Sequence, residues 1–441
     1  MSHTTATRNW ARLFEETAHR KFPPRIKDAV ADPGRFADPG ELPQFVTLLS
    51  AGLLVSEHAD TAMLADLVER SITTMLTVGP GPDFRDHEEL LSTAVRLIDV
   101  LARRGERTTQ LYLLAAQFRA GYANTDAVRN AYVERAVSSA QDDRELASAM
   151  LFQARFHADL SDYPKALTVL DQCRPLVAKT ALSDLRAEWN AACGLAHYYN
   201  EPATARRFFE EAIRVGSDHP DSTSARRAVG NALHFLGRIA ADEGEYHRAL
   251  TLYIEASRLS SEFKTGHGYY HQRVAEVLVD HGDLDEAQYH LEEAEKLFKA
   301  VGQVSNGLQL LQGTWARWHL RAGQVDDAVR SLSLAIASSR SERAARVELI
   351  LLAEMLRVRL RQRKPFAIAA VLSRAGRVYL TAEAIRSPRA FIRQTVAVAD
   401  RAITFLRVRK APTGAGKASP DQVRCPCGAK HHRSDRQQAD S

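Results

Sequence analysis

The sequence has few cysteines, prolines and glycines for its length, and it lacks long apolar runs. Its 441 residues include 4 Cys, 16 Pro and 23 Gly. Four cysteines exclude a small scaffold held together by disulfides. So few prolines and glycines exclude a collagen-like chain and favour helix. No run of 18 apolar residues occurs, so we expect no transmembrane helix and no membrane partner.

The amino-terminal segment also lacks the apolar stretch of a secretory signal. Residues 1–20 contain no continuous apolar stretch, and we therefore expect a cytoplasmic protein. The overall composition, with 45% hydrophobic and 26% charged residues, is that of a globular chain. Since a single core stops growing near about 250–300 residues, the length predicts several domains or one repeat array.

Charge is distributed unevenly along the chain. The net charge is +5, but residues 340–441 alone contain 22 Lys and Arg against 8 Asp and Glu. This region therefore carries a net charge of +14 and leaves −9 for the preceding residues. A basic end is compatible with nucleic-acid binding and equally with a solvated, arginine-rich helix surface.

A helix-pair pattern is the strongest signal in the sequence. Within residues 231–259, small and large side chains alternate at helical spacing on both sides of a glycine turn. Small residues let two antiparallel helices approach closely, while an aromatic ring fills the space between them. The residues that carry this pattern are Leu236, Gly237, Gly244, Ala249, Tyr253 and Ala256.

The same pattern recurs through the middle of the chain. The corresponding alanines, at intervals of 38 to 44 residues, are Ala166, Ala205, Ala249, Ala287 and Ala328. This pattern resembles the tetratricopeptide repeat, whose standard period is 34 residues, and it is similar to the repeat domains of bacterial regulators and sensors. The resemblance covers roughly residues 110–340. It implies an all-α fold, a solenoid of antiparallel helix pairs.

Breakers and composition divide the chain into four predicted regions. Proline- and glycine-containing breakers interrupt the amino-terminal part at 22–25, 31–40 and 78–83. We predict an N-terminal helical bundle at 1–85, the repeat array at 86–345, basic capping helices at 346–408 and a flexible basic tail at 409–441. Helices outside the repeats are expected at 8–20, 42–55, 60–76, 88–104, 341–362, 365–375 and 389–408.

The resemblance also implies a binding groove. In such arrays the first helix of each pair lines the concave face, where amide side chains can bond a peptide backbone and arginines can bind carboxylates. We therefore expect a peptide or protein partner. The predicted groove residues are Arg155, Asn190, His197, Asn231, His234, Arg238, Tyr269, Gln272, Glu276 and Arg317.

The tail contains one candidate metal site. Cys425 and Cys427 resemble the start of the zinc-binding motif at the carboxyl end of SecA proteins, and His431 and His432 follow. Two thiolates and two imidazoles could complete a tetrahedral zinc shell. Only three residues separate Cys427 from His431, so the alternative is a metal-free, redox-exposed tail. Zinc is the only cofactor that the sequence suggests.

Catalytic signatures are weak. Gly414–Lys417 lacks the upstream glycine and the following Ser or Thr of a phosphate-binding loop. His267 and His271 have helical metal spacing, but no metalloprotease motif accompanies them, and no local catalytic triad occurs. We therefore predict that the protein is not an enzyme. An enzyme whose site forms from residues distant in sequence stays the third alternative.

The leading hypothesis is a cytoplasmic interaction protein with a regulatory or signalling role. It would bind a peptide or protein segment in the groove, and its oligomeric state stays open. The alternative is a nucleic-acid-binding regulator that acts through its basic helices and contacts phosphates rather than bases. The residues for that alternative are Arg357, Arg359, Arg361, Arg363 and Lys364.

Overall fold

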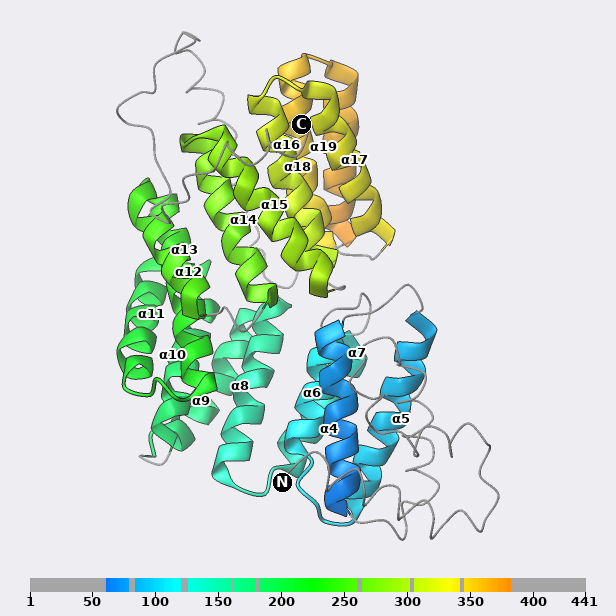
Figure 1. Ribbon diagram of the computed structural model, residues 1–441, viewed down its shortest axis with the longest axis vertical. Coiled ribbons are helices and arrows are strands. Elements are labelled where there is room, and N and C mark those ends of the chain that lie inside the picture. Colours follow the sequence, from blue (N-terminus) through cyan, green and yellow to red (C-terminus); the bar gives the residue numbers. More distant parts are fainter. Residues whose placement is uncertain are drawn as a thin grey trace, which may run out of the picture. The chain divides into compact units, whose positions relative to one another are not determined.

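The computed structural model describes residues 61–78, 84–119, 126–160, 162–179, 182–259, 264–301, 305–341 and 345–381. Within these ranges the chain forms sixteen α-helices, α4 to α19, and no strand (Figure 1). The all-α prediction is therefore confirmed. The chain divides into two compact units, of which the first comprises residues 1–153 with 301–303 and the second the remainder.

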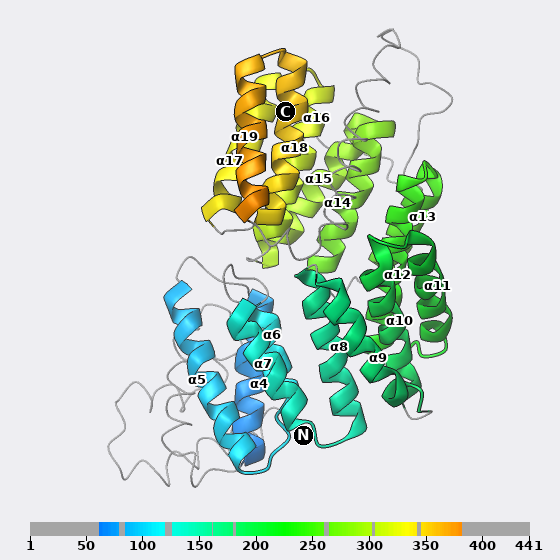
Figure 2. The same cartoon turned by 180° about the vertical axis from the view of Figure 1, so that it is seen from behind.

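The first unit packs its helices around one apolar core (Figure 2). Its elements are α4 (Thr61–Val78), α5 (Phe84–Arg103), α6 (Thr109–Arg119), α7 (Asp126–Ser139) and most of α8 (Asp143–Asp159). Apolar residues at helical spacing, such as Leu64, Val68 and Ile72 on α4, have no exposed surface, as expected for an amphipathic helix facing a core. The predicted helices at 60–76 and 88–104 correspond to α4 and α5.

The second unit is a succession of helices in antiparallel pairs. Its elements are α9 (Tyr163–Val177), α10 (Ser183–Tyr198), α11 (Pro202–Ser217), α12 (Thr223–Asp242), α13 (Tyr246–Leu259), α14 (Lys264–His281), α15 (Leu284–Val301), α16 (Ser305–Arg321), α17 (Val325–Ser341), α18 (Ala345–Gln362) and α19 (Pro365–Thr381). We call α10, α12, α14, α16 and α18 the first helices, and α11, α13, α15, α17 and α19 the second helices.

Local sequence signals explain where several of these helices begin and end. Asp162 and Ser222 cap α9 and α12 by accepting hydrogen bonds from backbone N–H groups three residues on, which satisfies otherwise unpaired donors. Pro202 starts α11 at a position where its missing N–H costs nothing. Gly244 and Gly323 have φ angles of 84° and 85° in the turns after α12 and α16, a conformation that other residues rarely adopt.

Each pair is held by small residues against aromatic rings. The repeat alanines Ala205, Ala249, Ala287 and Ala328 have no exposed surface. On the facing first helix, a Cβ added to Gly237 would lie 2.6 Å from the Tyr253 ring, so these helices approach closely only because position 237 has no side chain. The close packing predicted from the small residues is therefore confirmed.

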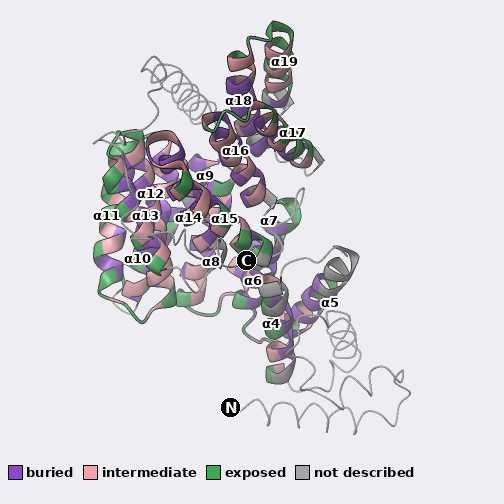
Figure 3. Cartoon of the chain, turned by 45° about the horizontal axis from the view of Figure 1, so that its top comes forward, coloured by how far each residue is buried: buried purple, intermediate pink, exposed green. Residues whose placement is uncertain are grey.

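Successive pairs contact one another both through their first helices and through the second helix of one pair and the first helix of the next, as in α11–α12, α13–α14 and α17–α18. In the second unit α10 packs on α12, α14 on α16, and α16 on α18, in addition to the contacts within the pairs α10–α11, α12–α13, α16–α17 and α18–α19. Buried residues follow the helix sides that face one another (Figure 3). This stacking brings side chains one repeat apart in sequence next to each other.

Only some of the helices predicted near the carboxyl end lie within the described residues. The predicted helix at 365–375 is α19, and it extends to Thr381. The helices expected at 8–20, 42–55 and 389–408 and the tail at 409–441 lie outside the described residues, and the predicted domain limits stay predictions. Among the helices described, none is long and apolar enough to cross a membrane.

Candidate binding face of the first helices

Charged side chains bridge adjacent helices along the side formed by α8 and the first helices. We call this side the first-helix face and define it by Arg155, Glu188, Arg227, Asn231, His234, Arg238, Arg273, Glu276, Asp280, Arg317 and Glu354. Each lies on α8, α10, α12, α14, α16 or α18. Its charges fall into two ion-pair clusters with one arginine between them.

The first cluster is centred on Glu188 of α10. Arg155 Nη1 lies 3.0 Å from the Glu188 Oε1 atom, and Arg227 Nη2 donates to the same oxygen at 3.2 Å. The Ser224 hydroxyl also donates to this carboxylate. Burial raises the pKa of Glu188, but the two guanidinium charges and the hydroxyl outweigh it and lower the pKa below its ordinary value. Glu188 is therefore ionised at neutral pH and links α8, α10 and α12.

The second cluster is centred on Arg317 of α16. Its guanidinium bonds Asp280 at 2.8 Å and lies 3.8 Å from Glu276 and 3.9 Å from Glu354. Arg273 pairs with Glu276 at 2.5 Å. Arg317 is 7% exposed, so it connects α14, α16 and α18 rather than presenting a free charge. Arg155 and Arg317, both predicted to bind carboxylates of a ligand, thus bind carboxylates of this chain.

Arg238 of α12 lies between these clusters and has a different environment. Its guanidinium carbon is 4.9 Å from the centre of the Tyr198 ring and 5.5 Å from that of Phe235, both cation–π distances. No carboxylate of the described residues lies within ion-pair distance of it. The aromatic faces and the more distant Asp242 carboxylate stabilise the charge of Arg238, and its guanidinium forms no hydrogen bond with a described residue.

The neighbours of Arg238 add further polar capacity. The Nδ1 atom of His234 is buried and has no hydrogen-bond partner among the described residues. Burial, and then the charges of Arg273 and Arg238, hold the pKa of His234 well below its ordinary value, so its ring is neutral at pH 7. Asn231, one turn before His234, is half-buried on the same side of α12. The Tyr269 ring on α14 packs against Phe298 instead, at a centroid distance of 5.0 Å, and burial raises its pKa to about 12.

The other predicted groove residues lie elsewhere. Gln272 is 1% exposed, and neither of its amide atoms has a partner among the described residues; its burial keeps it from a surface ligand. His197 stacks on Phe208 and lies 3.5 Å from Glu201. Asn190 is 4% exposed and lines a cleft between α9, α10 and α11. The first-helix face thus collects Arg155, Asn231, His234, Arg238, Glu276 and Arg317, but not these three or Tyr269.

The arginines of α18 do not form one exposed basic surface. Arg357 is 4% exposed and pairs with Glu354 at 3.0 Å. Arg361 donates to the Leu320 carbonyl of α16 at 2.6 Å, and Arg359 donates to Gln362. Arg363 and Lys364 are exposed at the end of the helix. Three of the five cations proposed for nucleic acid are therefore engaged within the chain, which does not favour that alternative.

Histidines of α14 and α15 form a separate cluster. The Nδ1 atoms of His271 and His290 lie 2.9 Å apart, and Ser257 is hydrogen-bonded to His267. Burial, with a smaller effect of His267, lowers the pKa of His271 to about 4. Over the described ranges, no group of three or more His, Cys, Asp or Glu side chains has a geometry that could hold a metal ion. The zinc candidates Cys425, Cys427, His431 and His432 lie outside those ranges.

Comparison with known proteins supports the fold rather than a particular function. No known family profile matches the sequence, and no curated protein matches it. Among solved structures, the chain is similar to a Rap protein complexed with competence and sporulation factor, at 12% identity and a TM-score of 0.52, covering 79% of this chain and 100% of that one. Aspartyl phosphate phosphatase F from Bacillus subtilis is 11% identical with a TM-score of 0.49, covering 87% and 96%.

A third similar structure contains a tetratricopeptide repeat sensor. It is a signal transduction ATPase with numerous domains from Pyrococcus horikoshii, 13% identical with a TM-score of 0.45, and the match covers 80% of this chain and 55% of that one. The fold is that of a tetratricopeptide repeat array. Tetratricopeptide repeats are expected to have the features described above, namely glycine turns, buried alanines and stacked helix pairs.

The sequence interpretation missed the acidic partners on this face. Glu188 and Asp280 did not stand out, because the residues that bind them lie far away along the chain. Arg227 is 39 residues from Glu188, and Arg317 is 37 residues from Asp280. Both separations match one repeat. Opposite charges at repeat spacing on first helices are therefore the signal that could have found these pairs.

Proposed function

We propose that this protein binds a peptide or protein segment on its first-helix face and acts as a regulatory interaction protein in the cytoplasm. The observation that carries the proposal is Arg238, a guanidinium that lies against two aromatic rings and forms no ion pair with a described carboxylate. Asp242 acts on this charge from beyond ion-pair distance, so the guanidinium N–H groups still lack an acceptor among the described residues, and a carboxylate or carbonyl of a bound segment would supply one.

The surroundings of Arg238 fit a peptide. Asn231 on the same helix can donate to a backbone carbonyl and accept from a backbone N–H, and the half-buried Phe235 ring beside Arg238 adds apolar surface. The similar Rap structure was solved in complex with competence and sporulation factor, which supports a bound partner for this fold without identifying one. The two ion-pair clusters flanking Arg238 hold the helices in register and so preorganise the site.

The experiment starts from an unbiased probe. A random dodecapeptide library is selected on the immobilised full chain, and enriched peptides are synthesised with a fluorescent label for polarisation measurements. We expect Arg238→Gln to weaken binding of these peptides by about tenfold or more, since a charge-assisted hydrogen bond is lost. Asn231→Ala should have a smaller effect in the same direction.

A matched control separates this effect from a general change in charge. Arg258→Gln removes an exposed arginine of α13, outside the first-helix face, and should leave the dissociation constant unchanged. Circular dichroism should show the same helix content in all variants. Peptides that bind the Arg238→Gln and wild-type chains equally well would place their site elsewhere and contradict the proposal.

A further inference from the structure

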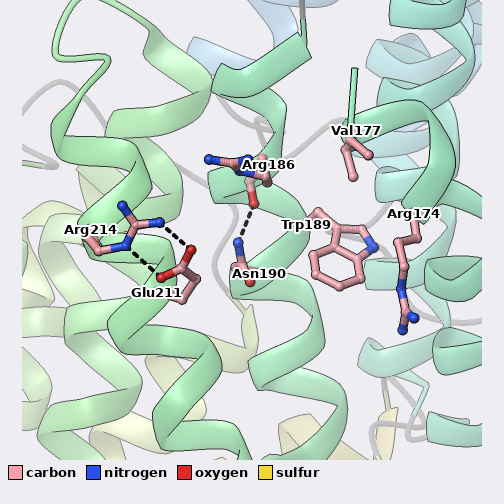
Figure 4. Close-up of a pocket in the computed structure, with 8 residues that line it drawn as sticks. Arg174, Val177, Arg186, Trp189, Asn190, Glu211 and Arg214 are labelled. Carbon is pink, nitrogen blue, oxygen red and sulfur yellow. Dashed lines mark hydrogen bonds and ion pairs between the residues drawn. The ribbon is translucent and has the colours of Figure 1, made fainter. Parts of the chain in front are cut away.

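A cleft of about 230 Å³ lies where α9, α10 and α11 meet (Figure 4). It is separate from the first-helix face. Glu188 points to α8 and α12, whereas Asn190, two residues later, lies about 200° further around α10. Arg186 is four residues before Asn190 and shares its side of the helix. The cleft is lined by Arg174, Val177, Ala178, Arg186, Trp189, Asn190, Glu211 and Arg214.

An immobilised indole forms the apolar wall of the cleft. The Trp189 N–H donates to the Leu170 carbonyl of α9 at 2.9 Å. Its ring meets the edge of Phe208 at a centroid distance of 5.9 Å, and the Arg174 guanidinium carbon lies 5.6 Å from the ring centre. With these three contacts in place the ring is fixed before any ligand arrives, so binding would cost little side-chain entropy.

The rim of the cleft is basic. Arg214 is engaged in a bidentate pair with Glu211, at 2.6 and 2.7 Å, and Arg174 pairs with Asp171 at 2.8 Å. Arg186 is exposed and has no hydrogen bond or ion pair from its guanidinium to a described residue. The Arg186 charge adds to the effect of Arg214 in lowering the pKa of Glu211 but forms no ion pair with it, and three guanidinium groups against two carboxylates leave a net charge of +1 at the rim.

An acceptor on the wall of the cleft completes the arrangement. The Asn190 amide nitrogen donates to the Arg186 carbonyl at 2.9 Å, which orients its Oδ1 atom away from that bond. This oxygen accepts no hydrogen bond from a described residue, although the residue is 4% exposed and lines the cleft. An acceptor beside a free guanidinium matches a backbone N–H next to a carboxylate.

We propose that this cleft docks an acidic peptide segment of a partner protein, independently of the first-helix face. An aspartate or glutamate of the segment binds Arg186, a neighbouring backbone N–H donates to Asn190 Oδ1, and an apolar side chain rests on Trp189. The volume is below the about 300–1,000 Å³ of small-molecule sites, so it holds one or two residues of a longer segment and not a whole nucleotide cofactor. A single aromatic ring gives little stacking for nucleic-acid bases.

The test uses defined probes on the full chain. The first set consists of end-capped, fluorescein-labelled nonapeptides in which two glutamates flank a leucine, phenylalanine or tyrosine. A matched set has glutamine in place of each glutamate. We expect the glutamate peptides to bind at least tenfold more tightly than the glutamine peptides at low salt, and the preference to shrink in 0.5 M NaCl. Arg186→Ala should abolish the preference, and Trp189→Leu should weaken both sets.

The controls distinguish this cleft from a diffuse basic surface and from the site proposed above. Arg207→Ala removes an exposed arginine that lies on α11 and does not line the cleft. This substitution should leave binding of the peptides unchanged, as should Arg238→Gln. Equal binding of glutamate and glutamine peptides, absence of binding, or equal losses in Arg186→Ala and Arg207→Ala would overturn the proposal. So would displacement of the peptides by single-stranded DNA at equal charge concentration.

Discussion

Glu188→Gln should destabilise the second unit by roughly 2–3 kcal/mol at neutral pH. The substitution keeps the shape of the side chain but removes the negative charge that two guanidinium groups share. Breaking a fully buried pair typically costs about 3–5 kcal/mol. The expected loss is smaller because the Arg155 and Arg227 side chains are 25% and 39% exposed, and water solvates part of their charge once the carboxylate is absent.

Urea unfolding followed by circular dichroism measures this loss. Glu210→Gln, at an exposed position of α11, is the matched control and should change stability by less than about 0.5 kcal/mol. Equal midpoints for Glu188→Gln and the wild type would show that the first cluster contributes nothing to stability. Replacing Arg155, Glu188 and Arg227 together with apolar residues should recover part of the loss, because no uncompensated charge then remains.

The pH dependence of the same variant follows from the lowered pKa of Glu188. A carboxyl group whose pKa is lower in the folded state contributes stability above its unfolded-state pKa of about 4.3, and this contribution disappears as the pH falls through the folded-state value. The stability difference between wild type and Glu188→Gln should therefore be constant from pH 6 to 7 and should narrow below about pH 4. A difference that widens on acidification would contradict the sign of this shift.

The helix pairs could be predicted from sequence because their determinants are local. Ala249, Ala287 and Ala328 recur at nearly fixed spacing, and each is fully buried against its partner helix. Gly244 and Gly323 mark turns whose positive φ angles require glycine. Both signals depend on residues within one helix pair, where spacing alone determines which side chains meet.

The candidate site was predicted less well because its interactions cross from one repeat to the next. Arg317 has the chemistry of a carboxylate-binding residue, and the sequence interpretation assigned that carboxylate to a ligand. The structure provides it from Asp280, 37 residues earlier. Asn190 and Glu188 are two residues apart but lie on different sides of α10. Their positions around the helix axis, and not their residue types, therefore determine which surface each side chain belongs to.

Gly237→Leu should be among the most destabilising single substitutions in the array, at about 3 kcal/mol or more. A Cβ at this position would lie 2.6 and 2.8 Å from Cε1 and Cδ1 of the Tyr253 ring. That ring is 2% exposed and cannot move aside into solvent. Leucine is the better helix former by nearly 1 kcal/mol, but overpacking a close helix–helix contact costs about 1–3 kcal/mol and occasionally more, and a leucine carries three carbons beyond Cβ.

Gly376→Leu is the matched control for this effect. Gly376 is an exposed residue of α19, and a Cβ there would meet no atom within 4 Å, so only the gain in helix propensity remains and stability should rise by up to about 1 kcal/mol. Shifts of the urea midpoint in opposite directions for Gly237→Leu and Gly376→Leu would separate the effect of packing from that of helix propensity.

The substitution Tyr253→Ala should destabilise the Gly237→Leu chain less than it destabilises the wild type, because the added leucine then fills the space that the ring leaves. Additive losses would mean that the two side chains do not compete for one space, and the close approach of α12 and α13 would need another cause.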